Sequence, residues 1–183
     1  MRKALVFALL LLPQAVLAAP PSAPKADSED QLFADLAKAQ SQDEAQGIED
    51  KLTAFFKVSG SPSIDLLMTR AGGALAAADN DTARKLIDAV TRVAPSYAEG
   101  WHQRAQLQAA ANDDAGAMLS LQKVVALNPR QFMAMAELAG MLEDYGDKPG
   151  ALKLYRRVLA LDPQNAVARQ EKALEKEVEG QGI

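Results

Sequence analysis

The chain has 183 residues and a formal net charge of −4; 49% of its residues are hydrophobic, only 5% are aromatic, and it contains no cysteine. A core built mainly of alanine, leucine and valine favours closely packed helices over a β-sandwich, which uses more aromatic and β-branched side chains. The acidic balance and the lack of a long basic run argue against nucleic-acid binding, which needs clustered Lys and Arg. Without cysteine, the chain has no disulfide, thiolate zinc site or cysteine nucleophile.

The N-terminal segment is typical of an export signal. Two basic residues precede the apolar stretch 4–12, and a run of small residues follows it. Val16 and Ala18 fit the −3 and −1 positions of a signal-peptidase site. We therefore predict a signal peptide at residues 1–18. An uncleaved anchor is the alternative, but the apolar stretch is shorter than the ~20 residues that a membrane-spanning helix needs.

A proline-rich flexible linker is predicted at residues 19–28, because proline lacks a backbone donor and favours extended chain. Capping boxes of the S-x-x-E/Q type then begin at Ser28 and Ser41. They predict a helical hairpin at residues 29–62, interpreted either as a degenerate repeat or as a cap that covers the first full repeat. No further hydrophobic span follows, so we expect no membrane span after signal cleavage.

A 34-residue period dominates the rest of the chain. Pro95, Pro129 and Pro163 are spaced by 34 residues, and each comes just after an apolar helical stretch. A fixed period of this length indicates an array of helix–turn–helix units. With the proline at position 32 of each unit, the three units are 64–97, 98–131 and 132–165.

Five other positions recur in phase with the prolines. Alanine occupies positions 8 and 20 in all three units, where two helices must cross closely: Ala71, Ala83, Ala105, Ala117, Ala139 and Ala151. Larger apolar residues occupy positions 4, 24 and 27: Leu67, Ile87, Val90, Trp101, Leu121, Val124, Met135, Tyr155 and Val158. On these residues, the chain resembles the tetratricopeptide-repeat (TPR) family over residues 64–165. The resemblance implies an all-α fold, a short TPR-type α-solenoid.

Local signals mark the helix ends. Turn or N-cap residues precede each second helix, at 79–82, 112–114 and 146–149. Ser96 and Glu99 match a capping box at the start of a first helix. Asn165 is predicted to cap a last helix at residues 166–179, whose polar outer face would close the solenoid.

The TPR resemblance implies a concave groove, lined by the first helix of each unit, in which a protein or peptide partner binds. Carried onto this sequence, the candidate groove residues are Asp65, Met68, Thr69, Glu99, His102, Gln103, Gln106, Met133, Glu137, Gly140, Glu143 and Asp144. They include five carboxylates and no Lys or Arg, and several others are small or flexible. This lining predicts a preference for apolar or basic segments, although acidic residues on an acidic protein also fit a simple solvated face.

TPR domains that bind chaperone tails grip a terminal carboxylate with Lys and Asn. His102 and Gln106 stand at two such positions here, so the sequence does not support that specialised function. His102 is the only histidine; it is interpreted as a surface residue or a partner contact, because no catalytic motif surrounds it. Trp101 is expected in the core. We expect no catalytic residue, metal site or cofactor.

Two functions remain open at this point. The first is a non-catalytic adaptor of the cell envelope, periplasmic rather than secreted, that binds protein or peptide through the groove. The second is a structural scaffold that self-associates as a homo-oligomer and has no groove ligand.

Overall fold

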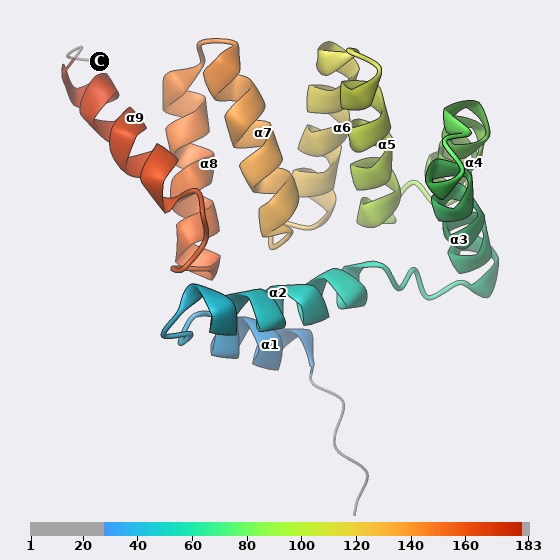
Figure 1. Ribbon diagram of the computed structural model, residues 1–183, viewed down its shortest axis with the longest axis horizontal. Helices are drawn as coiled ribbons and strands as arrows, with labels where there is room; N and C mark the ends of the chain where they lie inside the picture. Colours follow the sequence, from blue (N-terminus) through green and yellow to red (C-terminus); the bar gives the residue numbers. More distant parts are fainter. Residues whose placement is uncertain (1–27, 181–183) are drawn as a thin grey trace, which may run out of the picture.

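The computed structural model describes residues 28–180, with the side chains of residues 168 and 169 excepted. The predicted signal peptide at 1–18 and the linker at 19–28, apart from Ser28, lie outside these residues. The described chain is all-α (Figure 1). Its helices are α1 (Glu29–Leu36), α2 (Gln42–Phe56), α3 (Pro62–Ala76), α4 (Asn80–Val93), α5 (Ala98–Ala110), α6 (Asp114–Leu127), α7 (Phe132–Asp144), α8 (Lys148–Leu161) and α9 (Ala168–Gly180). Within this range, no helix has the length and apolar character needed to cross a membrane.

Helices α3 to α8 form three antiparallel pairs that stand side by side (Figure 1). The in-phase alanines at positions 8 and 20 are almost completely buried in every pair. The larger residues at positions 24 and 27 are also buried in all three, between the helices that these alanines allow to approach. Position 4 differs between pairs: Met135 is fully buried, whereas Trp101 is only partly buried at the edge of the core.

One turn design joins the two helices of each pair. The second residue after the first helix has left-handed backbone geometry in all three: Ala78 (φ 58°), Asn112 (φ 59°) and Gly146 (φ 86°). An aspartate follows it, and the aspartate N–H donates to a carbonyl of the helix just ended. The aspartate side chain then accepts the N–H three residues later, at 3.0 Å, and caps the next helix. The predicted caps at these turns, Asp79, Asp113 and Asp147, are confirmed.

The predicted capping box at Ser96 and Glu99 is wrong. Helix α5 has Tyr97 as its N-cap residue, and no side chain accepts a hydrogen bond there. Glu99 instead turns into the protein, where its side chain is 4% exposed and pairs with His102. The tertiary partner outcompetes the local cap, because a buried carboxylate needs a charged or hydrogen-bonding neighbour.

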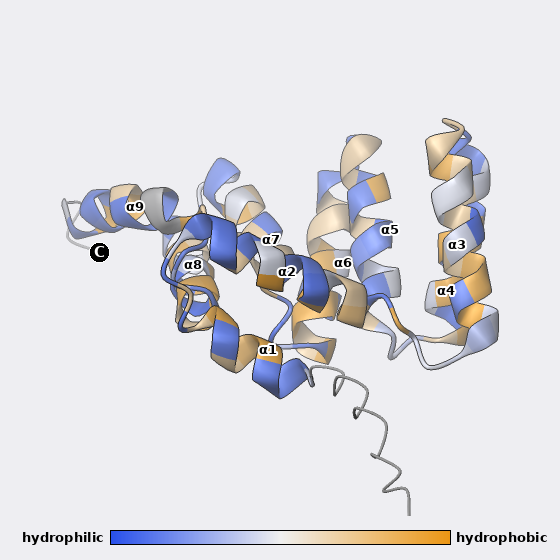
Figure 2. Ribbon diagram, turned by 60° about the horizontal axis from the view of Figure 1, so that its bottom comes forward, coloured by the Kyte–Doolittle hydropathy of each residue, from blue (hydrophilic) through white to orange (hydrophobic). Residues whose placement is uncertain are grey.

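The sequence led us to expect that the N-terminal hairpin covers the first repeat. It does not. Helices α1 and α2 lie across the ends of the α5–α8 stack, opposite the turns within each pair (Figures 1 and 2). Phe33 packs edge-on against Phe132, with ring centroids 6.4 Å apart. Arg130 lies over the Phe33 ring and pairs with Asp30 at 2.6 Å. The hairpin therefore packs against Phe132, at the start of α7, rather than against the exposed side of α3.

The main core accordingly joins α1, α2 and the helices from α5 to α9. The buried residues of the first pair lie outside this core: Ile64, Ala71, Ala83, Ile87 and Val90. This pair meets the stack through α4 and α5, where Gly100 leaves just enough room for Val90; a Cβ on Gly100 would lie 2.9 Å from the Val90 side chain. At the other end, α9 packs on α8 through the buried Leu174.

Candidate concave binding surface

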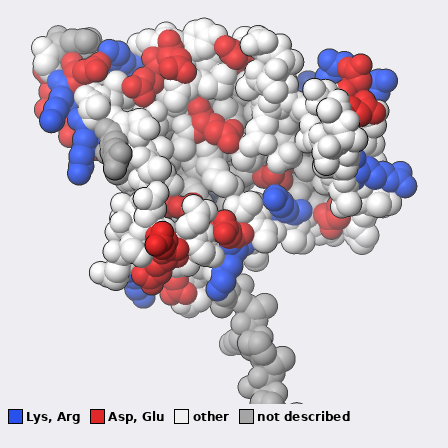
Figure 3. Space-filling model, in the orientation of Figure 1, with Lys and Arg blue, Asp and Glu red and all other residues white. Residues whose placement is uncertain are grey.

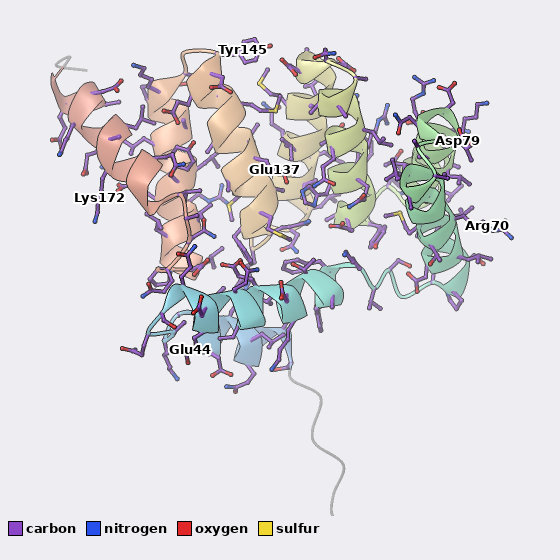
Figure 4. All side chains as sticks on the ribbon, in the orientation of Figure 1. Glu44, Arg70, Asp79, Glu137, Tyr145 and Lys172 are labelled. Atoms are coloured by element: carbon purple, nitrogen blue, oxygen red, sulfur yellow. The ribbon has the colours of Figure 1, made fainter. Side chains whose placement is uncertain are left out.

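The first helix of each pair, α3, α5 and α7, supplies the candidate groove residues. Figure 3 looks onto the face that carries Glu137, which Figure 4 labels near the middle of α7. Uncharged atoms and scattered carboxylates occupy the middle of this face (Figure 3). Lys and Arg gather toward its two ends and near α1 and α2. Two hollows lie between successive first helices, and we call them the α3–α5 hollow and the α5–α7 hollow.

The α3–α5 hollow has a volume of about 330 Å³. Five of the candidate residues line it: Asp65, Met68, Thr69, Glu99 and Gln103. Asp65 also accepts hydrogen bonds from the backbone N–H and the hydroxyl of Ser59, at 3.0 and 2.6 Å. These bonds hold the pKa of Asp65 below its usual value, so this carboxylate is charged and fixed at the edge of the hollow.

The α5–α7 hollow is larger, at about 520 Å³. Four candidate residues line it: Gln106, Glu137, Gly140 and Asp144. Its apolar lining comes from small or aliphatic side chains: Ala105, Ala109, Ala117, Leu121 and Met141. Asp114 and Tyr145 complete the lining, and the Tyr145 hydroxyl donates to Asp114 at 2.6 Å. Figure 4 shows Tyr145 at the far end of α7 from the hairpin, beyond Glu137.

The remaining three candidates have structural contacts. Met133 packs against the hairpin, where the Thr53 hydroxyl lies 3.6 Å from its sulfur. Glu143 accepts a hydrogen bond from Tyr155 of α8 at 2.9 Å. His102 is 3% exposed. Its interpretation as a surface residue is therefore wrong, and neither hollow counts it among its lining residues.

His102 is the centre of a buried polar cluster between the two hollows. Its Nδ1 lies 3.2 Å from Glu99 on the same helix, and its Nε2 lies 3.0 Å from Glu137 on α7. Gln106 donates to the same Glu137 oxygen at 3.2 Å. Gln131, which is fully buried before α7, donates to Glu99 at 2.9 Å. The cluster thus ties the second helix pair to the third.

Burial alone would lower the pKa of His102, because it disfavours the charged ring. The hydrogen bonds and charges of Glu137 and Glu99 outweigh burial and raise the pKa of His102 to about 9. For Glu99, burial favours the neutral acid, but the hydrogen bond and charge of His102 prevail and lower the Glu99 pKa. At neutral pH the cluster is therefore an imidazolium ion held between two carboxylates.

This arrangement positions groups but does not activate a nucleophile. Both ring nitrogens of His102 face carboxylates, so the ring has no free nitrogen to act as a base. Among the described residues, no group of three or more His, Cys, Asp or Glu side chains is arranged to hold a metal ion. What the geometry offers is a pair of hollows with fixed carboxylates at their edges.

Sequence reasoning missed several residues of the hollows, among them Lys57, Asp114 and Tyr145. Lys57, at the end of α2, lines the α3–α5 hollow, so the statement that the groove has no lysine is wrong. Its position follows from where the hairpin docks, which no local pattern encodes. Asp114 and Tyr145 come from a second helix and a turn, whereas the resemblance pointed only to first helices.

Comparison with known proteins gives the sequence and the fold their context. No protein-family model matches the chain. A curated TPR repeat-containing protein of Rhizobium etli is 31% identical over 118 residues, which make up 64% of this chain and 58% of that protein. The chain thus matches just over half of that relative's length.

Two solved structures extend the comparison. The first TPR of Spaghetti (RPAP3), bound to the HSP90 peptide SRMEEVD, has a TM-score of 0.57 at 19% identity; the match covers 63% of this chain and 92% of that one. The crystal structure of MamA also has a TM-score of 0.57, at 18% identity, and covers 75% of this chain and 78% of that one. The fold is a TPR-type α-solenoid.

The curated match supports a relationship to the tetratricopeptide-repeat family, and the two structures support the fold. Within the TPR-type fold, α3, α5 and α7 are the first helices and α4, α6 and α8 the second helices of the repeats. The α1–α2 hairpin is an addition to this array, docked across the ends of the second and third helix pairs.

Proposed function

We propose that this protein is a non-catalytic binding module that holds a segment of another protein along α3, α5 and α7. The observation that carries the proposal is the succession of two hollows on the first helices, together lined by nine of the twelve candidate groove residues. Small residues such as Gly72 and Gly140 leave the surface open to a helix or an extended peptide. The peptide-bound TPR of Spaghetti (RPAP3) supports the same use of a related fold.

The chemistry of the surface favours an apolar or basic segment. Asp114, Glu137 and Asp144 line the larger hollow without a Lys or Arg among its lining residues. The peptide SRMEEVD carries three acidic residues. A segment of that kind would be repelled here, because like charges at close range disfavour binding. The partner we propose is therefore chemically opposite to that chaperone peptide.

We also propose that the protein acts in the periplasm as an adaptor of the cell envelope. The support is in the sequence: the basic residues, apolar stretch and small residues at 1–18 suit export, and an absence of cysteine suits an oxidising compartment.

Site-specific photocrosslinking in cells tests both proposals. A photoreactive amino acid would replace Met68 or Gln106, which line the two hollows, and Leu119 as the control, because Leu119 is 68% exposed on α6 and lines neither hollow. We expect one partner protein to be captured from both hollow positions and not from Leu119. The mass of this protein in the crosslinked product should correspond to a chain that begins at Ala19.

Three outcomes would contradict these proposals. Capture of only a second copy of this chain would instead support the self-associating scaffold. Equal capture from Leu119 would move binding to the outer face. If this protein retains residues 1–18 in the crosslinked product, the proposed signal cleavage is wrong.

A further inference from the structure

The α5–α7 hollow combines an apolar floor with carboxylates at its edge. Ala105, Ala117 and Leu121, which belong to its floor, are each no more than 2% exposed. Glu137 stands at the edge, and its side chain is 40% exposed. A hollow of this kind suits a side chain with a long aliphatic stem and a polar end, because the stem buries apolar surface while the end stays near water.

Glu137 is oriented before any ligand arrives. Its Oε1 accepts from His102 at 3.0 Å and from Gln106 at 3.2 Å, which fixes the carboxylate from behind. In the described part of the chain, no hydrogen bond engages its Oε2. A fixed carboxylate with one unengaged oxygen binds a cation at a lower entropic cost than a mobile one.

Asp144 and Asp114 add negative charge toward the far end of the hollow. Asp144 follows Glu137 by seven residues on α7, which is two helical turns, or about 10 Å along the axis. Gly140 lies between them on the same lining and contributes no side chain. The Tyr145 hydroxyl donates to Asp114, and both side chains belong to the lining of the hollow.

We infer that the α5–α7 hollow is a pocket for a lysine or arginine side chain of the bound segment. The stem lies along Ala109, Gly140 and Met141, above the buried floor, and the cationic head meets Glu137. This inference rests on the proposed function, since it names the chemistry of the partner at one point of the same surface. The α3–α5 hollow differs, because Lys57 already places a positive charge there.

Small probes can test the pocket before the partner is known. The probes are N-acetyl-lysine methylamide, its arginine counterpart, and N-acetyl-norleucine methylamide, which has the apolar stem without the charge. They would be titrated into the isotope-labelled protein and followed by backbone amide NMR. We expect the two cationic probes to shift the signals of Ala105, Gly140 and Met141, about tenfold more tightly than norleucine. Added salt should weaken only the cationic probes.

Two variants distinguish the contribution of the Glu137 charge from that of the volume of the hollow. Glu137→Gln should weaken the cationic probes about tenfold and leave norleucine unchanged. Gly140→Leu should abolish all binding by filling the hollow. An added Cβ at Gly140 would meet only the Tyr155 hydroxyl, at 3.9 Å, so the helix accepts it. The matched controls are Glu179→Gln, an exposed charge on α9, and Gly47→Leu, an exposed glycine of α2 with open space around it.

The pocket inference fails if norleucine binds as well as lysine, if Glu137→Gln changes nothing, or if the shifts fall on the α3–α5 hollow. These failures differ from failure of the proposed function. Photocrosslinks from Met68 and Gln106 that persist while the probes fail would retain the binding module and reject the pocket. Probe binding without any crosslinked partner would retain the pocket and reject the binding module.

Discussion

His102 shows how one residue can serve the fold while it prepares a binding surface. The ring is 3% exposed and bridges Glu99 on α5 to Glu137 on α7. Removing one partner of such a buried ionic cluster leaves the others charged without compensation, which costs far more than the loss of an exposed ion pair. The same contact holds Glu137 at the edge of the α5–α7 hollow.

His102→Gln should lower the free energy of unfolding by about 3 kcal/mol at pH 6, measured by urea denaturation. The pKa of His102 is raised from 6.5 in the unfolded chain to about 9 in the folded one. The stability that its charge provides is therefore complete below pH 6.5 and is lost as the pH rises through 9. The difference in the free energy of unfolding between wild type and variant should therefore be smaller at pH 10 than at pH 6. An equal gap at both pH values would show that the ring acts only by filling space.

At the scale of elements, the docked hairpin has its own electrostatic feature. Glu49 of α2 faces Asp162, which is fully buried just after α8. Burial, followed by the hydrogen bond to Asp162 and its charge, raises the pKa of Glu49 to about 7. The two carboxyl groups share a proton more readily than they tolerate two negative charges. The hairpin is therefore held best when Glu49 is protonated.

Glu49→Gln should make this contact independent of pH. A raised carboxyl pKa contributes stability that is complete below the unfolded value of 4.5 and is lost as the pH rises through about 7. At pH 8 the variant should be the more stable protein by roughly 1 kcal/mol, a figure reduced because Glu49 is partly exposed. Melting temperatures of the wild type and the variant, measured at pH 5 and pH 8, would show this difference in stability. Asp43→Asn is the control on the same helix. A variant that is less stable at pH 8 would contradict the shared proton.

The repeats were predictable from sequence because each unit restates the same local chemistry. The alanines at positions 8 and 20 and the aspartate caps satisfy packing and hydrogen bonding within one unit, so three copies reinforce one another. The site was only partly predictable. Glu99 matched a local capping pattern, but its buried pairing with His102 prevailed. That pairing depends on Gln131, at the far end of the same unit, and on Glu137 from the next unit. Lys57 depended on the docking of a hairpin that has no repeat pattern.

At the scale of the whole molecule, the first repeat is set apart from the rest. Helices α3 and α4 stand at one end of the stack (Figure 1), and their buried residues lie outside the main core. Helix α3 also carries Gly72 and Gly73 in its interior, and each costs about 1 kcal/mol relative to alanine. Neither the hairpin nor α9 packs firmly against this pair. More than half of the residues that line the α3–α5 hollow therefore belong to the least supported repeat.

Hydrogen exchange followed by mass spectrometry should reveal this difference. Amides of α3 and α4 should exchange faster than those of α7 and α8, because local opening is easier where fewer apolar contacts must break. Gly73→Ala should slow exchange in α3, since an added Cβ there meets no atom within 4 Å and favours the helix. Uniform exchange across the three repeats would show instead that the array opens as one unit.

The crossing hairpin also sets the order in which the chain can complete its contacts. Thr53 contacts Met133, 80 positions later in the sequence, and Asp30 pairs with Arg130, 100 positions later. The Ala39 carbonyl accepts a hydrogen bond from Gln164, 125 positions later. A plain repeat array has low contact order and can fold outward from any unit, whereas this chain must close long loops. During synthesis the hairpin emerges before the repeats. Phe33 can then pack on Phe56 of α2, but its contact with Phe132 must wait until α7 has been made. The docking face of the hairpin thus stays uncovered until then, and a growing chain exposes it to aggregation or to chaperones in the interval.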